Sequence, residues 1–215
     1  PESISSRQAA AMMLQGMTAR YLLRGCYNVE SGDTVLIHAA AGGVGSILCQ
    51  WGRYIGAKII GTVGSERKAE IAVSNGCDYP IMYNSEDFVA RVKDITDGHG
   101  VDVVYDSVGQ ATFMKSMDCL RPMGMMVTFG QSSGPIAPLD LGILAAKGSL
   151  FLTRPSLMTY TAQRVDLLAH LDLLCFLVAA VAEIGDVFLV GHVGFGYQDR
   201  FGRGSVQNRT EQPYH

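Results

Sequence analysis

Hydrophobic and polar positions follow two different periods in the first part of the chain. Apolar side chains recur at helical spacing over Arg7–Cys26, whereas Thr34–His38 is a short run rich in β-branched residues. Such a run is typical of a strand that is buried on both faces of a sheet. A glycine-rich segment, Ala39–Gly45, follows directly, and helical spacing returns at Ser46–Ile55. The pattern therefore predicts a helix, a buried strand, a tight turn and a second helix.

The same alternation continues to about residue 153. Five further strands are predicted, at Lys58–Val63, Tyr79–Tyr83, Val101–Asp106, Gly124–Phe129 and Ser149–Thr153. Three helices are predicted between them, at Ser65–Ser74, Glu86–Thr96 and Gln110–Leu120. Strand–helix alternation with short loops indicates right-handed crossovers and a parallel sheet covered on both faces. The predicted fold is therefore α/β, with a doubly wound, parallel, six-stranded sheet.

The pattern loses its periodicity after residue 168. Leu171–Ala182 is apolar on nearly all sides but too short to span a bilayer, and Gly191–Gly204 contains five glycines without either period. We expect a domain at residues 5–168 and an atypical, partly disordered C-terminal tail at 169–215. A divergent segment, a changed reading frame, alternative splicing or a sequencing error would each produce this loss of pattern.

Composition narrows the class of protein. Hydrophobic residues make up 48% of the chain and charged residues 17%, which is typical of a folded globular protein. The formal net charge of -3 and the absence of basic blocks do not indicate a nucleic acid or a membrane as partner. The five cysteines are scattered without metal-ligand spacing, so we expect no metal site, reduced thiols and a cytoplasmic location.

The segment between the first strand and the second helix carries the clearest chemical signal. Its sequence, from Ala40 to Gly45, follows an A-x-G-x-x-G spacing. Gly42 lets the backbone approach a pyrophosphate, and Gly45 lets the helix pack closely on the strand. A helix that begins near Gly43 offers free N–H groups to the phosphates. A plain tight turn is the alternative, but the strand–turn–helix setting favours a dinucleotide site in a Rossmann sheet.

The end of the next strand indicates which dinucleotide is bound. NAD-specific sites place a carboxylate there for the ribose 2′-hydroxyl, whereas this strand ends at Gly64 and is followed by Ser65, Arg67 and Lys68. A hydroxyl and cations bind a 2′-phosphate through charge-assisted hydrogen bonds. Glu66 is ambiguous, and the cations alternatively form a solvated helix face. We predict NADPH as the cofactor.

Two more glycine- and hydroxyl-containing segments follow predicted strands, at Asp106–Gly109 and Phe129–Gly134. Ligands of open α/β sheets bind at the carboxyl ends of the strands, so both segments are candidates for the nicotinamide half of the cofactor, although ordinary turns would look the same. The candidate residues are Ser107, Phe129, Gly130, Ser132 and Ser133.

Several strings occur together in this order, at Gln15–Ala19, His38–Gly45, Gly61–Gly64, Tyr105–Gly109, Leu141–Leu144 and Thr153–Ser156. Together they resemble the NADPH:quinone oxidoreductase (zeta-crystallin-like) branch of the zinc-free medium-chain dehydrogenase/reductase superfamily, over about Ser5–Leu168. Because the chain begins with Pro1, we expect a fragment that carries the cofactor domain and lacks the family's N-terminal barrel-like domain.

The resemblance implies a reductase that passes hydride from NADPH to quinones or other α,β-unsaturated carbonyls, and a homodimer. It implies that Gly43 and Val44 contact the pyrophosphate and that Thr18 lies near the nicotinamide. It also implies that Ser65, Lys68 and Tyr83 hold the 2′-phosphate and its ribose. Ser107 and Phe129–Ser133 would line the cofactor trough, and no dedicated catalytic residue is expected.

Two alternatives remain at this stage. The first is a non-catalytic nucleotide-binding protein, because relatives in this family serve as crystallins or bind RNA. The second is an alcohol dehydrogenase of the same superfamily, which the missing cysteine cluster disfavours.

Overall fold

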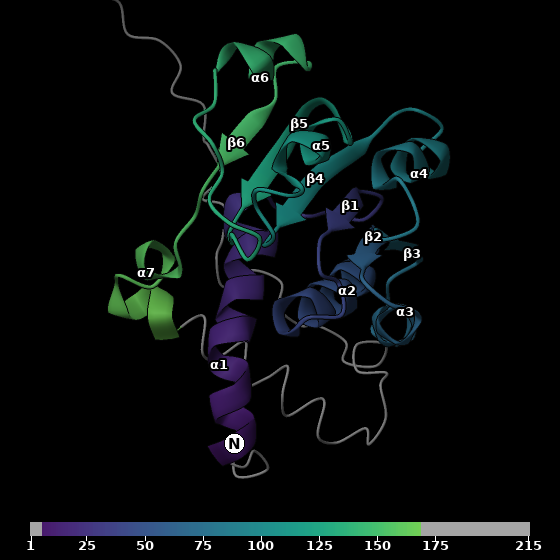
Figure 1. Cartoon of the computed structure of the whole chain (residues 1–215). Helices are drawn as coiled ribbons and strands as arrows, with labels where there is room; N and C mark the ends of the chain where they lie inside the picture. The colour runs from purple at the N-terminus through teal and green to yellow at the C-terminus, as the bar shows by residue number, and fades with distance from the viewer. Residues whose placement is uncertain (1–5, 169–215) are drawn as a thin grey trace, which may run out of the picture.

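The computed structural model describes residues 6–168, and its centre is a six-stranded parallel sheet (Figure 1). The strand order is β3-β2-β1-β4-β5-β6. The strands are β1 (Thr34–Ile37), β2 (Lys58–Val63), β3 (Tyr79–Met82), β4 (Val101–Asp106), β5 (Leu120–Thr128) and β6 (Phe151–Thr153). The order reverses between β1 and β4, which confirms the predicted doubly wound fold. The predicted tail, 169–215, lies outside the described residues.

Helices cover both faces of the sheet. One face is covered by α1 (Ser6–Arg20), the π-helical turn η1 (Tyr21–Cys26), α2 (Gly43–Ile55) and α3 (Glu66–Ser74). The other face is covered by α4 (Phe88–Ile95), α5 (Phe113–Met117) and α6 (Gly142–Ala146). The short helix α7 (Leu157–Tyr160) packs on η1, where the rings of Tyr160 and Tyr21 stack at 4.8 Å. Figure 1 shows α7 beside the upper half of α1.

Each central strand contributes side chains to two hydrophobic cores. In β1, Val35 and Ile37 point toward α1 and α2, and Leu36 points toward the opposite core. All three side chains are fully buried. The continuous apolar run therefore supplies buried side chains to both faces of the sheet, as expected for a parallel sheet between helical layers.

The structure corrects the predicted element boundaries around β5. The helix predicted at Gln110–Leu120 ends at Met117, and β5 begins at Leu120 rather than at Gly124. Two residues obscured the strand, since Pro122 lacks a backbone donor and Met123 has a φ of 59°. The ladder with β4 shifts register at the same place.

Three local features were not predicted. The first helix changes from α to π geometry at Tyr21, and α6 and α7 are additional short helices. Both short helices have no more than five residues, too few for a periodic pattern to emerge from the sequence.

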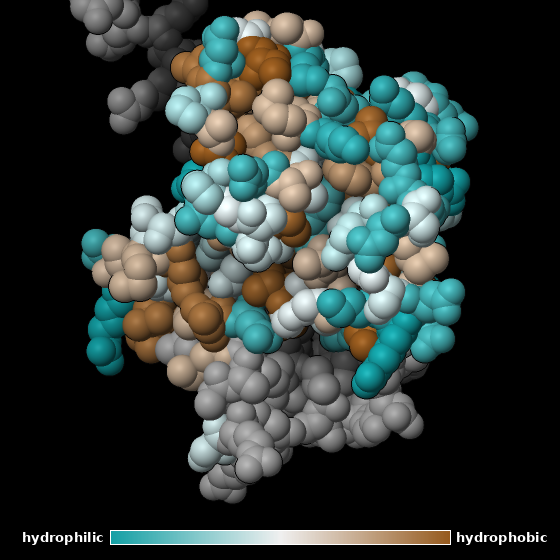
Figure 2. Space-filling model, viewed as in Figure 1, coloured by the Kyte–Doolittle hydropathy of each residue, from teal (hydrophilic) through white to brown (hydrophobic). Residues whose placement is uncertain are grey.

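The strand β6 forms one edge of the described sheet, and no described strand pairs with its outer side. Hydrophobic residues gather at the surface around α6, above β6 (Figure 2), where Leu141 and Phe151 are exposed. Within residues 6–168, none of the helices has the length and apolar character needed to cross a bilayer.

Candidate functional site

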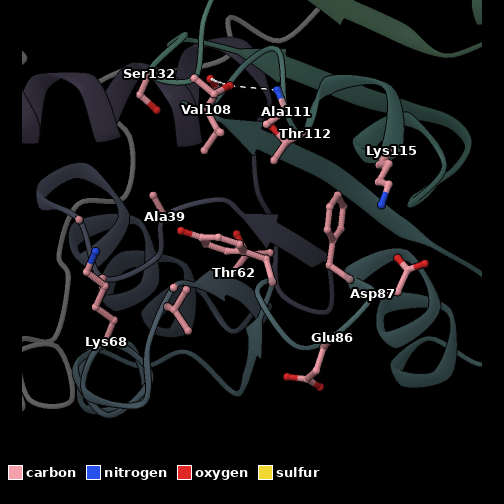
Figure 3. A pocket seen from close by; sticks show the side chains of 17 residues that line it. Ala39, Thr62, Lys68, Glu86, Asp87, Val108, Ala111, Thr112, Lys115 and Ser132 are labelled. Carbon is pink, nitrogen blue, oxygen red and sulfur yellow. Dashed lines mark hydrogen bonds between the residues drawn. The ribbon is translucent and has the colours of Figure 1, made fainter.

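A cavity of about 540 Å³ lies at the carboxyl ends of the strands, across the point where the strand order reverses. Its lining comes from the loops after β1, β2, β3, β4 and β5 (Figure 3). Among the residues that predictions had assigned to a cofactor, six line it: Gly42, Gly64, Lys68, Tyr83, Ser132 and Ser133. The other eight predicted residues do not line the cavity.

The turn between β1 and α2 forms one wall of the cavity. Ala39 adopts a left-handed conformation, with a φ of 54°, and its carbonyl oxygen accepts a hydrogen bond from the N–H of Gly42 at 2.8 Å. Gly45 lies so close to this turn that a Cβ would approach the Ala39 oxygen to 2.4 Å. The β1–α2 connection therefore holds the start of α2 directly against the end of β1. Sequence reasoning did not single out Ala39, whose conformation glycine would adopt more readily.

Two predicted pyrophosphate contacts lie at the start of α2, outside the cavity lining. Gly43 is covered by the side-chain amide of Gln15 from α1, whose atoms lie 2.4–2.5 Å from the position of a Cβ. Val44 is half-buried against the core that includes α1. Thr18 is nearly buried in α1 and donates to the carbonyl oxygen of Leu14 at 2.7 Å.

The helix that follows β2, α3, contributes the cation that was expected to select NADPH. Lys68 and Gly64 both line the cavity, and the hydroxyl of Tyr83 lies 2.6 Å from the position of a Cβ on Gly64. Ser65 is the N-cap of α3, where its hydroxyl accepts a hydrogen bond from the backbone N–H of Lys68 at 3.4 Å. Glu66 does not line the cavity. The only group of α3 that lines the cavity among the described residues is therefore the ammonium group of Lys68.

The opposite end of the cavity was not predicted from the sequence. Lys115 and Asp87 face one another across it, far from Lys68 in the view of Figure 3. The Asp87 carboxylate caps α4 by accepting the N–H of Val89 at 3.0 Å, and Glu86 accepts from Arg91 at 3.1 Å. Neither Lys68 nor Lys115 pairs with a carboxylate of the described residues. Two ammonium groups without an ion-pair partner among the described residues therefore line the cavity together with the carboxylates of Glu86 and Asp87.

The two predicted nicotinamide segments pack against each other, and Val108, Ser132 and Ser133 from them line the cavity. A Cβ on Gly130 would lie 2.5 Å from the carbonyl oxygen of Ser107, so only glycine fits there. The hydroxyl of Ser133 donates to the carbonyl oxygen of Val108 at 2.7 Å and accepts the N–H of Ala111 at 2.9 Å. Phe129 is half-buried against the core. The loops after β4 and β5 thus form one connected wall.

Asp106 fixes the loop after β4. Its carboxylate is fully buried and accepts hydrogen bonds from the N–H groups of Val108 at 2.7 Å and Gly109 at 3.0 Å. The hydroxyl of Thr112 donates to the same carboxylate at 2.8 Å. These contacts start α5 after the loop, so the carboxylate acts as a structural acceptor.

The buried imidazole of His38 lies beneath the site, at the end of β1. Its two ring nitrogens hydrogen-bond the hydroxyls of Thr62 at 2.9 Å and Ser116 at 2.8 Å. Burial lowers the pKa of His38 below its ordinary value of 6.5, and the charge of Asp106 opposes this effect in part. The imidazole is therefore neutral in the folded protein near pH 7.

We expect the free energy of unfolding to decrease as the pH falls below about 6.5, by up to about 1.4 kcal/mol per pH unit. The unfolded chain binds a proton on His38 in that range, whereas the folded chain with its lowered pKa does not, and above pH 6.5 the effect vanishes. Urea denaturation of wild type and His38→Gln between pH 5 and 8 measures it. The variant should show the smaller pH slope; equal slopes would contradict a neutral buried imidazole.

Comparison with known proteins identifies the family. A model of the family described as zinc-binding dehydrogenase matches residues 43–167. The chain belongs to this family. Within residues 6–168, no three His, Cys, Asp or Glu side chains gather as metal ligands.

The family members most like this chain include quinone oxidoreductases. Quinone oxidoreductase from Salmonella typhimurium is 51% identical over 180 residues, which is 84% of this chain and 55% of the relative. The 2-haloacrylate reductase of a Burkholderia species is 51% identical over 162 residues, 74% of this chain and 48% of the relative. The crystal structure of Escherichia coli quinone oxidoreductase complexed with NADPH superimposes with a TM-score of 0.82 at 49% identity, covering 85% of this chain and 56% of that one.

These matches confirm the predicted resemblance to quinone oxidoreductases and the cofactor-domain fold of a medium-chain reductase. The chain spans about half the length of the curated relatives it matches.

Proposed function

We propose that this chain is the NADPH-binding part of a reductase that transfers hydride to quinones or other α,β-unsaturated carbonyls. The observation that carries the proposal is the chemistry at the end of β2, where Lys68 lines the cavity without a described carboxylate partner. A 2′-phosphate requires such a cation, whereas a ribose 2′-hydroxyl is usually bound by a carboxylate.

The residues around the cavity fit the parts of the dinucleotide in order. Gly42, with the amino end of α2 at Gly43 and Val44, would hold the pyrophosphate, because no Cβ on Gly42 obstructs the approach. Ser65, Lys68 and Tyr83 would hold the 2′-phosphate and its ribose. Thr18, Ser107 and the segment Phe129–Ser133 would lie along the nicotinamide half.

The bound nicotinamide would supply the hydride, and the chain would supply binding and orientation. Holding the two reactants in a productive geometry provides much of the rate in such a reaction, so no acid, base or nucleophile from this chain is assigned. The names of two relatives, a quinone oxidoreductase and a 2-haloacrylate reductase, support an electron-poor conjugated acceptor.

A second candidate is a nucleotide-binding protein without turnover. Such a protein would bind the nucleotide in the same cavity, beside Lys68, and would differ from the reductase only in leaving the bound NADPH unoxidised.

Titration of the 215-residue chain with NADPH and NADH, followed by nucleotide fluorescence, tests the proposal. We expect NADPH to bind at least about tenfold more tightly, since one charge-assisted interaction contributes about 1.5–3 kcal/mol. Equal affinities for NADPH and NADH would contradict the assignment of Lys68 to the 2′-phosphate. If neither nucleotide bound, the proposal itself would be wrong. Reduction of a quinone by the same preparation would exclude the non-catalytic candidate; NADPH binding without turnover would support it.

We also propose that two copies associate through the free edge of β6, because an exposed strand edge can pair with its counterpart. A quinone or enone remains the proposed small-molecule partner, and neither a membrane nor a nucleic acid is proposed. A cytoplasmic location is consistent with the described cysteines, which are all free thiols.

A further inference from the structure

Arg154, the first residue after β6, reaches across to the carboxyl end of β5. Its Nη1 atom donates to the carbonyl oxygen of Thr128 at 2.9 Å and to that of Gly130 at 3.1 Å. The β5–β6 ladder ends at the pair Val127 and Thr153, one position earlier on each strand. The guanidinium therefore continues the attachment between the two strands beyond the last backbone pair.

Among the described residues, the backbone N–H groups of the segment held by Arg154 donate toward β4 and the loop that follows it. The N–H groups of Phe129 and Gly130 donate to the carbonyl oxygen of Asp106 at 2.9 and 3.3 Å, and the N–H of Ser132 donates to that of Ser107 at 3.2 Å. These amide contacts fix one side of the segment, and Arg154 fixes the carbonyl oxygens on the other side. Because its guanidinium is planar and always charged, it can bind both carbonyl oxygens from one position.

We propose that Arg154 is the positioning residue for the nicotinamide half of the site. It fixes the backbone of residues 128–130 and thereby sets where the segment Phe129–Ser133 lies along the cavity. This inference rests on the proposed NADPH function. Arg154 does not itself line the cavity, and Lys68, at the adenosine end, belongs to a different segment. Loss of the guanidinium therefore weakens the contacts to the nicotinamide half of the dinucleotide and leaves those to the adenosine half unchanged.

Hydrogen exchange of the unliganded protein tests the positioning directly. Arg154→Met keeps an aliphatic side chain but removes the donors, so amides of residues 129–133 should exchange faster, while those of β2 keep their rates. Arg121→Met is the matched control, since it removes a guanidinium that bonds Asp102 at 2.6 Å, at the amino end of β4. Unchanged exchange in 129–133 for Arg154→Met, or an equal acceleration in both variants, would overturn the inference.

A pair of ligands then separates positioning from general destabilisation. NADPH contains both halves of the dinucleotide, whereas adenosine 2′,5′-bisphosphate lacks the nicotinamide half. Arg154→Met should weaken NADPH binding about 5- to 10-fold, as expected for the loss of one ordered contact region, and should leave binding of the bisphosphate unchanged. Equal weakening of both ligands, or of neither, would overturn the inference. If wild type binds neither ligand, the proposed function fails, and the exchange rates still decide whether Arg154 orders the segment.

Discussion

Replacing Gly45 with alanine is expected to lower the free energy of unfolding by about 3 kcal/mol. The new methyl group would lie 2.4 Å from the carbonyl oxygen of Ala39 and 2.9 Å from two backbone atoms of Ala40. All three are main-chain atoms of the turn after β1, so they cannot rotate away from the methyl group. The helix α2 would therefore have to move off the sheet. Urea denaturation followed by the fluorescence of Trp51, in α2, measures the change.

Gly43→Ala is the matched control for Gly45→Ala. The atoms nearest to a Cβ at Gly43 belong to the amide of Gln15, which is the far end of a flexible side chain and can rotate away. We expect a loss below about 1 kcal/mol for this variant, the usual range for a surface change. If Gly45→Ala lowered the free energy of unfolding no more than Gly43→Ala does, α2 could move to accommodate the methyl group. Close packing at Gly45 would then not be what the turn requires.

Replacing Lys68 with alanine is expected to weaken NADPH binding by about 10- to 30-fold and to leave NADH binding unchanged. The ammonium group lines the cavity and has no described carboxylate partner, so its charge is available to a 2′-phosphate that NADH lacks. Because the side chain is exposed, the effect should diminish as salt rises. Fluorescence titrations of both nucleotides at two ionic strengths measure it.

Arg67→Ala provides the control for Lys68→Ala. Arg67 is the neighbouring exposed cation on α3 but does not line the cavity, so its removal changes the net charge equally without touching the site. Equal weakening of NADPH in the two variants would indicate a general effect of charge. Loss of NADH affinity in Lys68→Ala would indicate instead that the lysine holds a part common to both cofactors.

The strands of this fold could be predicted because their signals are local. β2 and β4 begin and end where the apolar runs do, since both strands are covered on both faces and carry few polar residues. β5 could not be delimited, because Pro122 and the left-handed Met123 stand inside it and are usually found in turns. The ladder pairs Leu120 with Val101 and then resumes at Met125–Val127, which pair with both β4 and β6, so the strand runs through Pro122 and Met123, which the ladder skips.

The site divides in the same way. The glycine turn comes directly after β1, and Gly64 and Lys68 come within five residues of the end of β2. A spacing argument within each short segment could therefore find Gly42, Gly64 and Lys68. Lys115 reaches the cavity from α5, and Arg154 reaches the loop after β5 from the end of β6. Lys115 stands in no motif, and the string Thr153–Ser156 contributes to the resemblance without indicating what Arg154 contacts. Both roles depend on packing between segments that are distant in sequence.

The position of β1 and β4 at the centre of the sheet also constrains how the protein folds. Their ladder joins Val35 to Val103, residues 68 positions apart. Gly42 and Lys68 come from the first half of the chain, whereas Val108 and Ser132 come from the second, and both halves line one cavity. Closing so long a loop is a slow, entropically costly step. The cavity therefore does not exist in either half-sheet alone and requires the long-range pairing of β1 with β4.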